Sequence, residues 1–354
     1  MDINEILQLA VDKHASDIFI VAGTKLAFKI DGIIQPIGEE KLTPDRTRTY
    51  VEEIYRMSSG VRKSIDMLDN IGEDDFSFSL SKVGRFRVNA YYQRGSLAAV
   101  LRVVRFKLPD PEVYHISPSI LELSKLNKGL VLVTGSAGSG KSTTLACIVD
   151  EINKTKNDHI ITIEDPIEYL HSHNRSIVSQ REIGHDTKDY LIALRAALRE
   201  APNVILVGEM RDLETVSVAL NAAETGHLVL STLHTMGASE TISRIVDMFP
   251  SNQQEQIRIQ LAMVLQAVVS QQLVRGVDGK MYPSFEIMKA CPAIRTQMRE
   301  NKLHLIDNTI SQNKDNGMIT MDDSLMKLYK DGIIDKDTLL QHANNPEQIL
   351  KKIN

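Results

Sequence analysis

Residues 135–142 read Gly-Ser-Ala-Gly-Ser-Gly-Lys-Ser, which matches the pattern G-x-x-x-x-G-K-[ST] and constrains the fold more than any other feature of the chain. An apolar run at 130–134, typical of a buried strand, precedes it, and a segment with helical character follows. This is the context that a phosphate-binding loop requires. The glycines allow backbone N–H groups to turn toward phosphate oxygens, and the positive end of the helix adds to this attraction. The sequence therefore predicts a nucleotide site on a parallel α/β sheet.

The residues of this loop are expected to bind ATP. Lys141 is expected to reach the β- and γ-phosphates, and Ser142 to ligate Mg²⁺. The predicted nucleotide-binding residues are Gly135, Ser136, Ala137, Gly138, Ser139, Gly140, Lys141, Ser142 and Thr143. Hydrolases, kinases and proteins that only bind nucleotides all carry such loops, so the loop alone does not choose among them.

Three further apolar runs alternate with helical stretches after residue 120, at 159–163, 204–208 and 228–233. Near-continuous apolar strands separated by helices are typical of a parallel sheet that is covered on both faces. After about residue 250 we expect mainly helices, with one hairpin at Asp278-Gly279.

Acidic residues follow two of these predicted strands. Glu164, Asp165 and Glu168 come after the run at 159–163, and Glu209 comes directly after the run at 204–208. Ligands of parallel sheets bind at the carboxyl ends of the strands. An acid at the tip of the strand beside the phosphate loop holds Mg²⁺, directly or through water, and another acid orients the attacking water. The pattern indicates hydrolysis and leaves open which glutamate is the general base.

Two histidines bracket the strand at 228–233. Seven residues of strand span about 23 Å, so His227 and His234 cannot both contact one phosphate. His234 lies at the carboxyl end and is the better candidate for a γ-phosphate sensor, whereas His227 is expected to serve a packing or subunit contact. His171 and His173 have metal-like spacing but no third ligand nearby, so we do not expect a metal site there.

The first hundred residues show a different pattern of apolar residues from the nucleotide-binding part of the chain. A helix is predicted at 2–13, and alternating apolar residues with a turn at Asp31-Gly32 predict an antiparallel sheet. Three prolines between 107 and 120 are typical of a linker. We therefore expect an α+β domain at 1–106, a linker at 107–119 and the nucleotide-binding domain with a helical C-terminal region at 120–354.

A run of arginines precedes this linker. An arginine brought to a γ-phosphate from outside the nucleotide domain can raise the rate of phosphoryl transfer by about 10³ to 10⁵. We expect at least two of the run to act in this way, in the same chain or in a neighbouring one. The run comprises Arg85, Arg87, Arg94, Arg102 and Arg105, and the catalytic candidates among them are Arg87, Arg94 and Arg102.

Composition narrows the class of protein. The chain has 46 acidic and 41 basic residues, so bulk charge gives no reason to expect binding to nucleic acid or anionic lipid. Cys147 and Cys291 are the two cysteines, which allow neither a disulfide framework nor a four-cysteine zinc site. The N-terminus carries acids where a secretory signal would carry bases, and no apolar run is long enough to span a membrane. We expect a cytoplasmic protein with no integral membrane segment.

Several longer motifs resemble those of the secretion ATPase superfamily, and within it those of the type IV pilus retraction ATPases of the PilT kind. They are Ala-Ser-Asp at 15–17, FRVNA at 86–90, TIEDPIEY at 162–169, LVGEMRDLET at 206–215 and AAETGHLVLSTLHT at 222–235. The resemblance covers nearly the whole chain. It implies a PAS-like N-terminal domain joined to a RecA-like ATPase domain, assembled as a ring-shaped homohexamer with nucleotide at the subunit junctions.

The same resemblance implies a function and its residues. It implies a motor that hydrolyses ATP to drive pilus retraction and twitching motility, acting on an inner-membrane platform protein from the cytoplasmic face of the membrane at the pilus base. It implies that Glu168 and Glu209 share the positioning of the metal and the water, and that His227 and His234 belong to the motif that the family calls the His box. The segment 293–300 matches a retraction signature in part, and Phe19 stands where the family usually has histidine.

Three competing functions stay open. An assembly or type II secretion ATPase usually carries an extra N-terminal domain and a four-cysteine zinc element, and neither fits 354 residues with two cysteines. A RecA-like nucleic-acid motor would share the core fold, but the chain has no tryptophan and no basic stripe with interleaved aromatic residues. A structural component could bind ATP without turnover.

Overall fold

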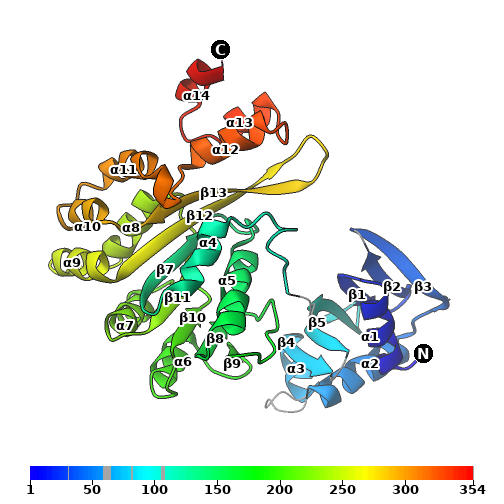
Figure 1. Ribbon diagram of the computed structural model, residues 1–354. Helices are drawn as coiled ribbons and strands as arrows, with labels where there is room; N and C mark the ends of the chain where they lie inside the picture. The colour runs from blue at the N-terminus through cyan, green and yellow to red at the C-terminus, as the bar shows by residue number, and fades with distance from the viewer. Residues whose placement is uncertain (31, 59–64, 81–82, 105–107, 354) are drawn as a thin grey trace. The chain divides into compact units, whose positions relative to one another are not determined.

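The structure is a computed structural model that describes residues 1–30, 32–58, 65–80, 83–104 and 108–353 (Figure 1). The chain divides into two compact units. The first comprises residues 1–107 with 168–170 and 184–186, and the second comprises the rest. Asp31 of the predicted hairpin and Arg105 of the predicted arginine run lie outside the described residues.

A six-stranded antiparallel sheet forms the centre of the first unit, in the order β3-β2-β1-β6-β5-β4. Its strands are β1 (Asp17–Ile20), β2 (Lys25–Ile30), β3 (Ile33–Lys41), β4 (Glu73–Leu80), β5 (Gly84–Gln93) and β6 (Ser96–Val104). Three helices accompany it, namely α1 (Ile3–Asp12), α2 (Pro44–Met57) and α3 (Ile65–Ile71). The predicted α+β class with an antiparallel sheet is therefore confirmed.

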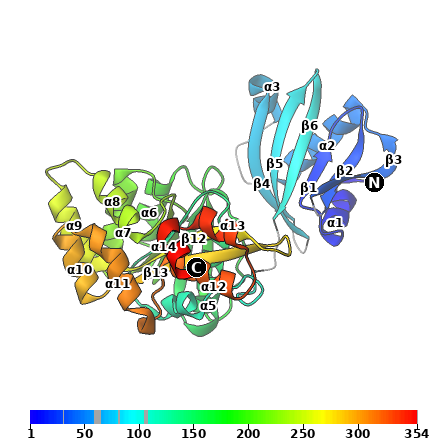
Figure 2. The ribbon, with the colours of Figure 1, turned by 90° about the horizontal axis from the view of Figure 1, so that it is seen from above.

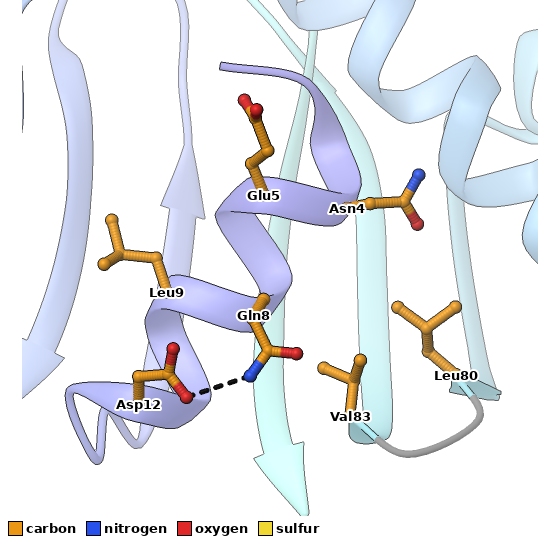
Figure 3. Close-up of a pocket in the computed structure, with 7 residues that line it drawn as sticks. All are labelled: Asn4, Glu5, Gln8, Leu9, Asp12, Leu80 and Val83. Carbon is orange, nitrogen blue, oxygen red and sulfur yellow. Dashed lines mark hydrogen bonds between the residues drawn. The ribbon is translucent and has the colours of Figure 1, made fainter.

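Helix α1 begins where the sequence predicts it. The Glu5 N–H donates to Asp2 Oδ1 and the Asp2 N–H donates to Glu5 Oε2, both at 2.9 Å, which is a complete capping box. The periodic apolar residues of α1 are buried against the sheet in one core with Phe28 and Phe86. On its other side, α1 borders a shallow groove with Leu80, at the end of β4, and Val83, directly before β5. In this groove the Gln8 side chain donates a hydrogen bond to Asp12 at 2.9 Å (Figure 3).

Strand β3 is an edge of this sheet and pairs only with β2 among the described strands. Almost all of its residues are exposed, including Ile33 at 66% and Ile34 at 59%. Its second half carries a proline, a glycine and three charged residues at 36–41.

The second unit contains a seven-stranded sheet in the order β13-β12-β7-β11-β10-β8-β9. Six strands run parallel and β13 is antiparallel to β12. The strands are β7 (Gly129–Thr134), β8 (His159–Glu164), β9 (Ile177–Glu182), β10 (Val204–Val207), β11 (Leu228–Leu233), β12 (Leu265–Arg275) and β13 (Met281–Lys289). This is the predicted mostly parallel sheet of a RecA-like domain.

Helices cover both faces of this sheet, as the apolar strands predict. In β7, Leu130 and Leu132 belong to one buried core, and Val131 and Val133 belong to another. The helices that contribute to these two cores are α4 (Pro118–Leu121), α5 (Lys141–Thr155), α6 (Tyr190–Ala197), α7 (Leu213–Glu224), α8 (Ala238–Asp247), α9 (Gln254–Val264), α10 (Pro292–Arg299) and α11 (Ile306–Gln312).

Three C-terminal helices, α12 (Met321–Lys330), α13 (Lys336–His342) and α14 (Pro346–Ile353), form a further small core with Val274 of β12. Figure 2 shows them gathered over β12 and β13. The predicted hairpin at Asp278-Gly279 joins these two strands, and Gly279 has the positive φ of 81° that its turn requires. Residues 293–300 lie in and directly after α10, which buries Ile294 and Met298.

Two features of the sheet differ from the sequence-based expectation. Strand β11 lies between β7 and β10, so the strand that ends before Glu209 is not the immediate neighbour of the strand that precedes the phosphate loop. The sequence pattern does not predict β9, and it does not predict that β12, the first strand of the hairpin at Asp278-Gly279, pairs with β7 and so joins the central sheet. The residues at 108–119, expected as part of a linker, belong to the second unit, where Ile116 is buried.

Candidate nucleotide site

The phosphate loop connects β7 to α5. Gly138 and Gly140 have φ of 77° and 89°, in the left-handed region that glycine adopts most easily. Gly135 has φ of 141°, and a Cβ there would lie 2.2 Å from the backbone oxygen of Gln271 and 2.7 Å from Ser139 Oγ. Only glycine fits at this position, because the loop passes directly against the backbone of β12.

The polar groups of the loop fit phosphate oxygens. The buried Lys141 ammonium donates to the carbonyl oxygens of Gly135 and Ser136, both at 2.9 Å, and so lies over the loop. Two hydroxyls, Thr134 Oγ1 and Ser139 Oγ, are buried without a hydrogen-bond partner in the described part of the chain. A cationic loop with spare hydroxyl groups next to the start of a helix is suited to an anion.

Gln271 of β12 lies against this loop and the first turn of α5. Its Oε1 accepts a hydrogen bond from Thr144 Oγ1 at 2.7 Å, and its Nε2 would lie 2.8 Å from a Cβ at Gly140. Gln271 is 2% exposed. Sequence reasoning misses this residue, because no local pattern links residue 271 to a loop about 130 positions earlier.

A cavity of about 490 Å³ opens beside the loop. It borders Gly140 and Thr143, and the rings of His115 and Tyr282 lie 5.3 Å apart in its wall. A site with aromatic and apolar walls and this volume is suited to a purine base, and the neighbouring loop would then face the phosphates. The remaining lining residues are Val113, Tyr114, Ile116, Gln271, Leu273, Lys280, Met281 and Pro283.

Glu209 and His234 come together at the carboxyl ends of β10 and β11. His234 Nε2 lies 3.4 Å from Glu209 Oε2, and Glu209 Oε1 forms an ion pair with Arg211. The Glu209 side chain is 12% exposed, whereas that of His234 is 54% exposed. The structure thus places a nearly buried carboxylate beside a histidine that reaches solvent. The sequence pattern does not predict Arg211 as a partner of Glu209.

Tyr190, at the start of α6, faces the same acids. Burial raises the pKa of its hydroxyl, and the carboxylates of Asp165, Glu209 and Glu164 raise the pKa further. The acids that follow β8 and the acid that follows β10 therefore share one neighbourhood, as their places at the strand ends predict. The Tyr190 hydroxyl also lies 2.9 Å from the position of a Cβ at Gly208, so this glycine allows the close approach.

Glu168 and Ser142, the other predicted catalytic and metal-binding candidates, are both at least partly open to solvent. Glu168 is exposed and lies four residues beyond the end of β8, and the preceding residue is fixed by a hydrogen bond from the Ile167 N–H to Glu182 Oε2 at 3.0 Å. Ser142, the second residue of α5, is half-buried. His227 lies at the other end of β11 from His234, and its Nδ1 lies 3.0 Å from the carbonyl oxygen of Ala222 in α7.

The predicted arginines of the first unit form two groups. Arg87 of β5 and Arg102 of β6 face each other across the strands, and each has an acidic partner at 3.3 Å, Asp75 and Asp17 respectively. Arg94 lies in the exposed turn between these strands, seven residues along the chain from Arg87. The structure therefore brings Arg87 and Arg102 together and leaves Arg94 apart from them.

Neither histidine of the 171–173 segment belongs to a metal site among the described residues. Burial lowers the pKa of His171 to about 4, and its Nδ1 has no hydrogen-bond partner in the described ranges. His173 is exposed and accepts a hydrogen bond from the Val178 N–H.

A pH dependence of stability follows from His171. Its folded-state pKa of about 4 lies below the ordinary value of 6.5, so the unfolded chain binds the proton first as the pH falls. The stability that His171 contributes is complete above the unfolded pKa and is lost toward pH 4. We expect wild type to lose about 2 kcal/mol more than His171→Gln between pH 7 and pH 5 in urea unfolding. His173→Gln is the matched control and should follow wild type, and equal losses in all three proteins would contradict the expectation.

Comparisons with known proteins agree with this fold. A family model described as "Type II/IV secretion system protein" matches residues 1–345. The type IV pilus retraction ATPase PilT of Pseudomonas aeruginosa is 42% identical over 347 residues, which cover 98% of this chain and 99% of PilT. The type IV pilus ATPase PilU of the same organism is 37% identical over 99% of this chain and 90% of PilU.

Among solved structures, the crystal structure of the pilus retraction motor PilT with bound ADP matches with a TM-score of 0.90 and 46% identity, over 99% of each chain. The agreement of sequence, family model and fold extends over nearly the whole length. The chain therefore belongs to the type II/IV secretion system protein family.

Proposed function

We propose that this protein is a hexameric motor that hydrolyses ATP to drive retraction of type IV pili. One observation carries the proposal. Glu209 and His234 lie next to each other at the carboxyl ends of β10 and β11, and β7, which pairs with β11, leads into a complete phosphate loop. The end-to-end similarity to a pilus retraction ATPase supports retraction as the work performed.

Different residues of the site would bind the base, the phosphates and the metal ion of the nucleotide. The base would occupy the cavity beside Gly140 and Thr143, and the loop amides would hold the phosphates. The Lys141 ammonium would exchange its two carbonyl partners for β- and γ-phosphate oxygens. Ser142 and Glu209 are suited to hold Mg²⁺, which when bound neutralises charge on the phosphates.

Hydrolysis requires a positioned water. Glu209 and Glu168 are the candidates to orient it, and Glu209 would have to exchange its ion pair with Arg211 for this role. His234 reaches solvent at the same edge of the sheet and is suited to contact the γ-phosphate. Loss of the γ-phosphate would then change the contacts of the residue that follows β11. Arg87 and Arg102, with Arg94 as the separate third candidate, would supply positive charge from the same chain or from a neighbour.

The partners follow from the same proposal. A homohexamer would place each nucleotide next to a second subunit, and the motor would act on a pilus platform protein in the inner membrane. Among the described residues, no helix is both long and apolar enough to cross a bilayer. We therefore place the protein at the cytoplasmic face of the membrane, attached through its partner, and propose no role for nucleic acid.

The decisive experiment replaces Lys141 with alanine in the chromosome of the source organism. Without the ammonium, the β- and γ-phosphates lose the cation that the loop supplies, and we expect cells that make pili, fail to retract them and do not twitch. Lys128→Ala is the matched control, because Lys128 is exposed at the opposite end of β7. Pilus counts by electron microscopy and stab-agar motility give the result. Cells without pili would instead indicate an assembly motor, and normal twitching would contradict the proposal.

Purified protein distinguishes a retraction motor from a nucleic-acid motor and from a structural component. We expect ATP hydrolysis that DNA does not stimulate. Strong stimulation by DNA would favour a nucleic-acid motor, and binding of ATP by the hexamer without hydrolysis would favour a structural role.

A further inference from the structure

The His234 connection, which comprises residues 234–237, joins β11 to α8. Strand β11 lies on one side of β7 in the sheet, and β12 lies on the other side. At the far end of the connection, the Gly237 N–H donates a hydrogen bond to Ser270 Oγ of β12 at 2.8 Å. Ser270 pairs with Thr134, the last residue of β7. The connection therefore crosses the carboxyl end of β7, where the phosphate loop begins.

Two side chains from neighbouring strands fix the far end of the connection. Ser270 of β12 and Glu286 of β13 are directly paired, so their side chains lie on the same face of the sheet. Ser270 Oγ accepts from the Gly237 N–H, and Glu286 Oε1 accepts from the Ala238 N–H at 2.8 Å. Gly237 is the N-cap residue of α8 and has no side chain that could accept a hydrogen bond there. Ser270 and Glu286 therefore supply acceptors at the start of α8 from the sheet.

The connection and the first turn of α8 form one unit. The hydroxyls of Thr235 and Thr241 lie 2.8 Å apart, and Thr241 Oγ1 donates to the carbonyl oxygen of Gly237 at 2.7 Å. Ser270 is 0% and Glu286 is 2% exposed, so the surrounding packing fixes both acceptors in the sheet. The two acceptors thus tie a preformed unit to β12 and β13.

The next residue of β12 lies against the phosphate loop and the first turn of α5. Gln271 Oε1 accepts from Thr144 Oγ1 of α5 at 2.7 Å, and a Cβ at Gly135 would lie 2.2 Å from the Gln271 backbone oxygen. Neighbouring residues of a strand point to opposite faces of the sheet, so the Ser270 side chain reaches the His234 connection and the Gln271 side chain reaches α5. Residues 270 and 271 therefore fix the His234 connection relative to the phosphate loop.

The side chain of His234 needs a fixed backbone if it is to reach one point repeatedly. It is 54% exposed, and its Nε2 lies 3.4 Å from Glu209 Oε2. A displacement of about 1 Å near reacting atoms can lower a rate by about a hundredfold. His234 follows β11 directly, and Ser270 and Glu286 hold the other end of its connection. The position of His234 therefore depends on both ends.

We propose that Ser270 and Glu286 are positioning residues that hold His234 in place relative to the phosphate loop during ATP hydrolysis. This inference rests on the proposed ATP hydrolysis and deepens it, because it names the residues that place the expected γ-phosphate contact. Neither side chain would touch the nucleotide, since both act through the His234 connection.

A double-mutant cycle tests whether Ser270 acts through His234. Ser270→Ala removes the acceptor of the Gly237 N–H, and we expect kcat to fall about tenfold with KM within about twofold of wild type. His234→Ala should lower kcat at least as much. Adding Ser270→Ala to His234→Ala should then change kcat by less than about twofold, because the group that Ser270 positions is already absent. An equal loss in both backgrounds would overturn the inference, and so would wild-type hydrolysis by His234→Ala.

Glu286 is tested by a pair of variants of similar size. Glu286→Gln keeps an acceptor oxygen for the Ala238 N–H, whereas Glu286→Met has none. We expect kcat to fall about tenfold in Glu286→Met and to stay within about threefold of wild type in Glu286→Gln. Equal values of kcat in the two variants would contradict the role given to Glu286.

Ser284→Ala is the matched control for Ser270→Ala. Ser284 of β13 is also 0% exposed, but its hydroxyl donates to Ser324 of α12 at 3.0 Å instead of reaching the connection. It should lower the urea midpoint of unfolding about as much as Ser270→Ala and leave kcat unchanged. If Ser270→Ala does not fold, Ser270→Cys takes its place in the cycle, because the thiol has a similar shape and is a weak acceptor.

Failure of the inference and failure of the proposed function give different results. A wild-type protein that hydrolyses ATP, with a loss of kcat in Ser284→Ala equal to that in Ser270→Ala, would overturn the positioning role alone. A wild-type protein that does not hydrolyse ATP would overturn the proposed function, and the positioning role with it.

Discussion

Replacing Glu209 with glutamine is expected to lower kcat for ATP hydrolysis by about a thousandfold and to leave nucleotide binding intact. The phosphate loop and the cavity beside it would hold the nucleotide without Glu209, whose own contacts are Arg211 and His234. Glutamine keeps the shape of the side chain but can neither take a proton from water nor balance the charge of a cation. Binding and hydrolysis should therefore separate.

The measurement compares ADP affinity by calorimetry with steady-state ATP hydrolysis. Glu214→Gln is the matched control, because Glu214 is an exposed acid in the first turn of α7, a few residues along the same connection. Glu168→Gln completes the series and decides which carboxylate orients the water. If Glu209→Gln hydrolyses ATP at the wild-type rate and Glu168→Gln does not, the general base is Glu168 and the role given to Glu209 is wrong.

Replacing Gly135 with alanine is expected to abolish nucleotide binding. A Cβ at this position would lie 2.2 Å from the backbone oxygen of Gln271, and backbone cannot move as the end of a flexible side chain can. Either the loop separates from β12 or the strand shifts, and in both cases the carbonyl oxygens that hold Lys141 are displaced. We expect no measurable ADP binding at concentrations about a hundredfold above the wild-type Kd.

Gly138→Ala is the control from the same loop. Gly138 also has a positive φ, of 77°, but a Cβ there would meet no atom within 4 Å beyond its chain neighbours. It should show only the cost of the backbone conformation, about 1 kcal/mol, and still bind nucleotide. Wild-type affinity in Gly135→Ala would show that the loop does not need its contact with β12. Circular dichroism of both variants separates a local effect from unfolding.

Local pattern is sufficient to predict the loop and the strand ends. The phosphate loop, Glu209 and His234 each follow an apolar run that forms a strand buried on both faces of the sheet. The residues after such a strand lie at the carboxyl edge of a parallel sheet, where ligands bind. Local pattern cannot give the order of the strands, because order depends on pairing between distant segments. For that reason the position of β11 between β7 and β10 emerges only from the structure.

The same limit explains the residues that sequence reasoning misses. Gln271 lies against the phosphate loop because its strand, β12, pairs with β7, and the sequence pattern does not reveal this pairing. His115 and Tyr282 come together from segments more than 160 positions apart. Arg211 follows Glu209 closely in sequence, but an exposed arginine near an acid is too common to single out. The prolines around residues 113–116 predict a linker, yet these residues line the cavity beside the phosphate loop.

Strand β3 has a consequence for a protein proposed to assemble in rings. An exposed edge strand with Ile33 and Ile34 is a template on which a second chain could add its own strand and start irregular aggregates. The rest of β3 counters this hazard, because Pro36 lacks an N–H and the Glu-Glu-Lys end repels or solvates an incoming strand. The β3 edge of the first unit is thus protected against disordered association.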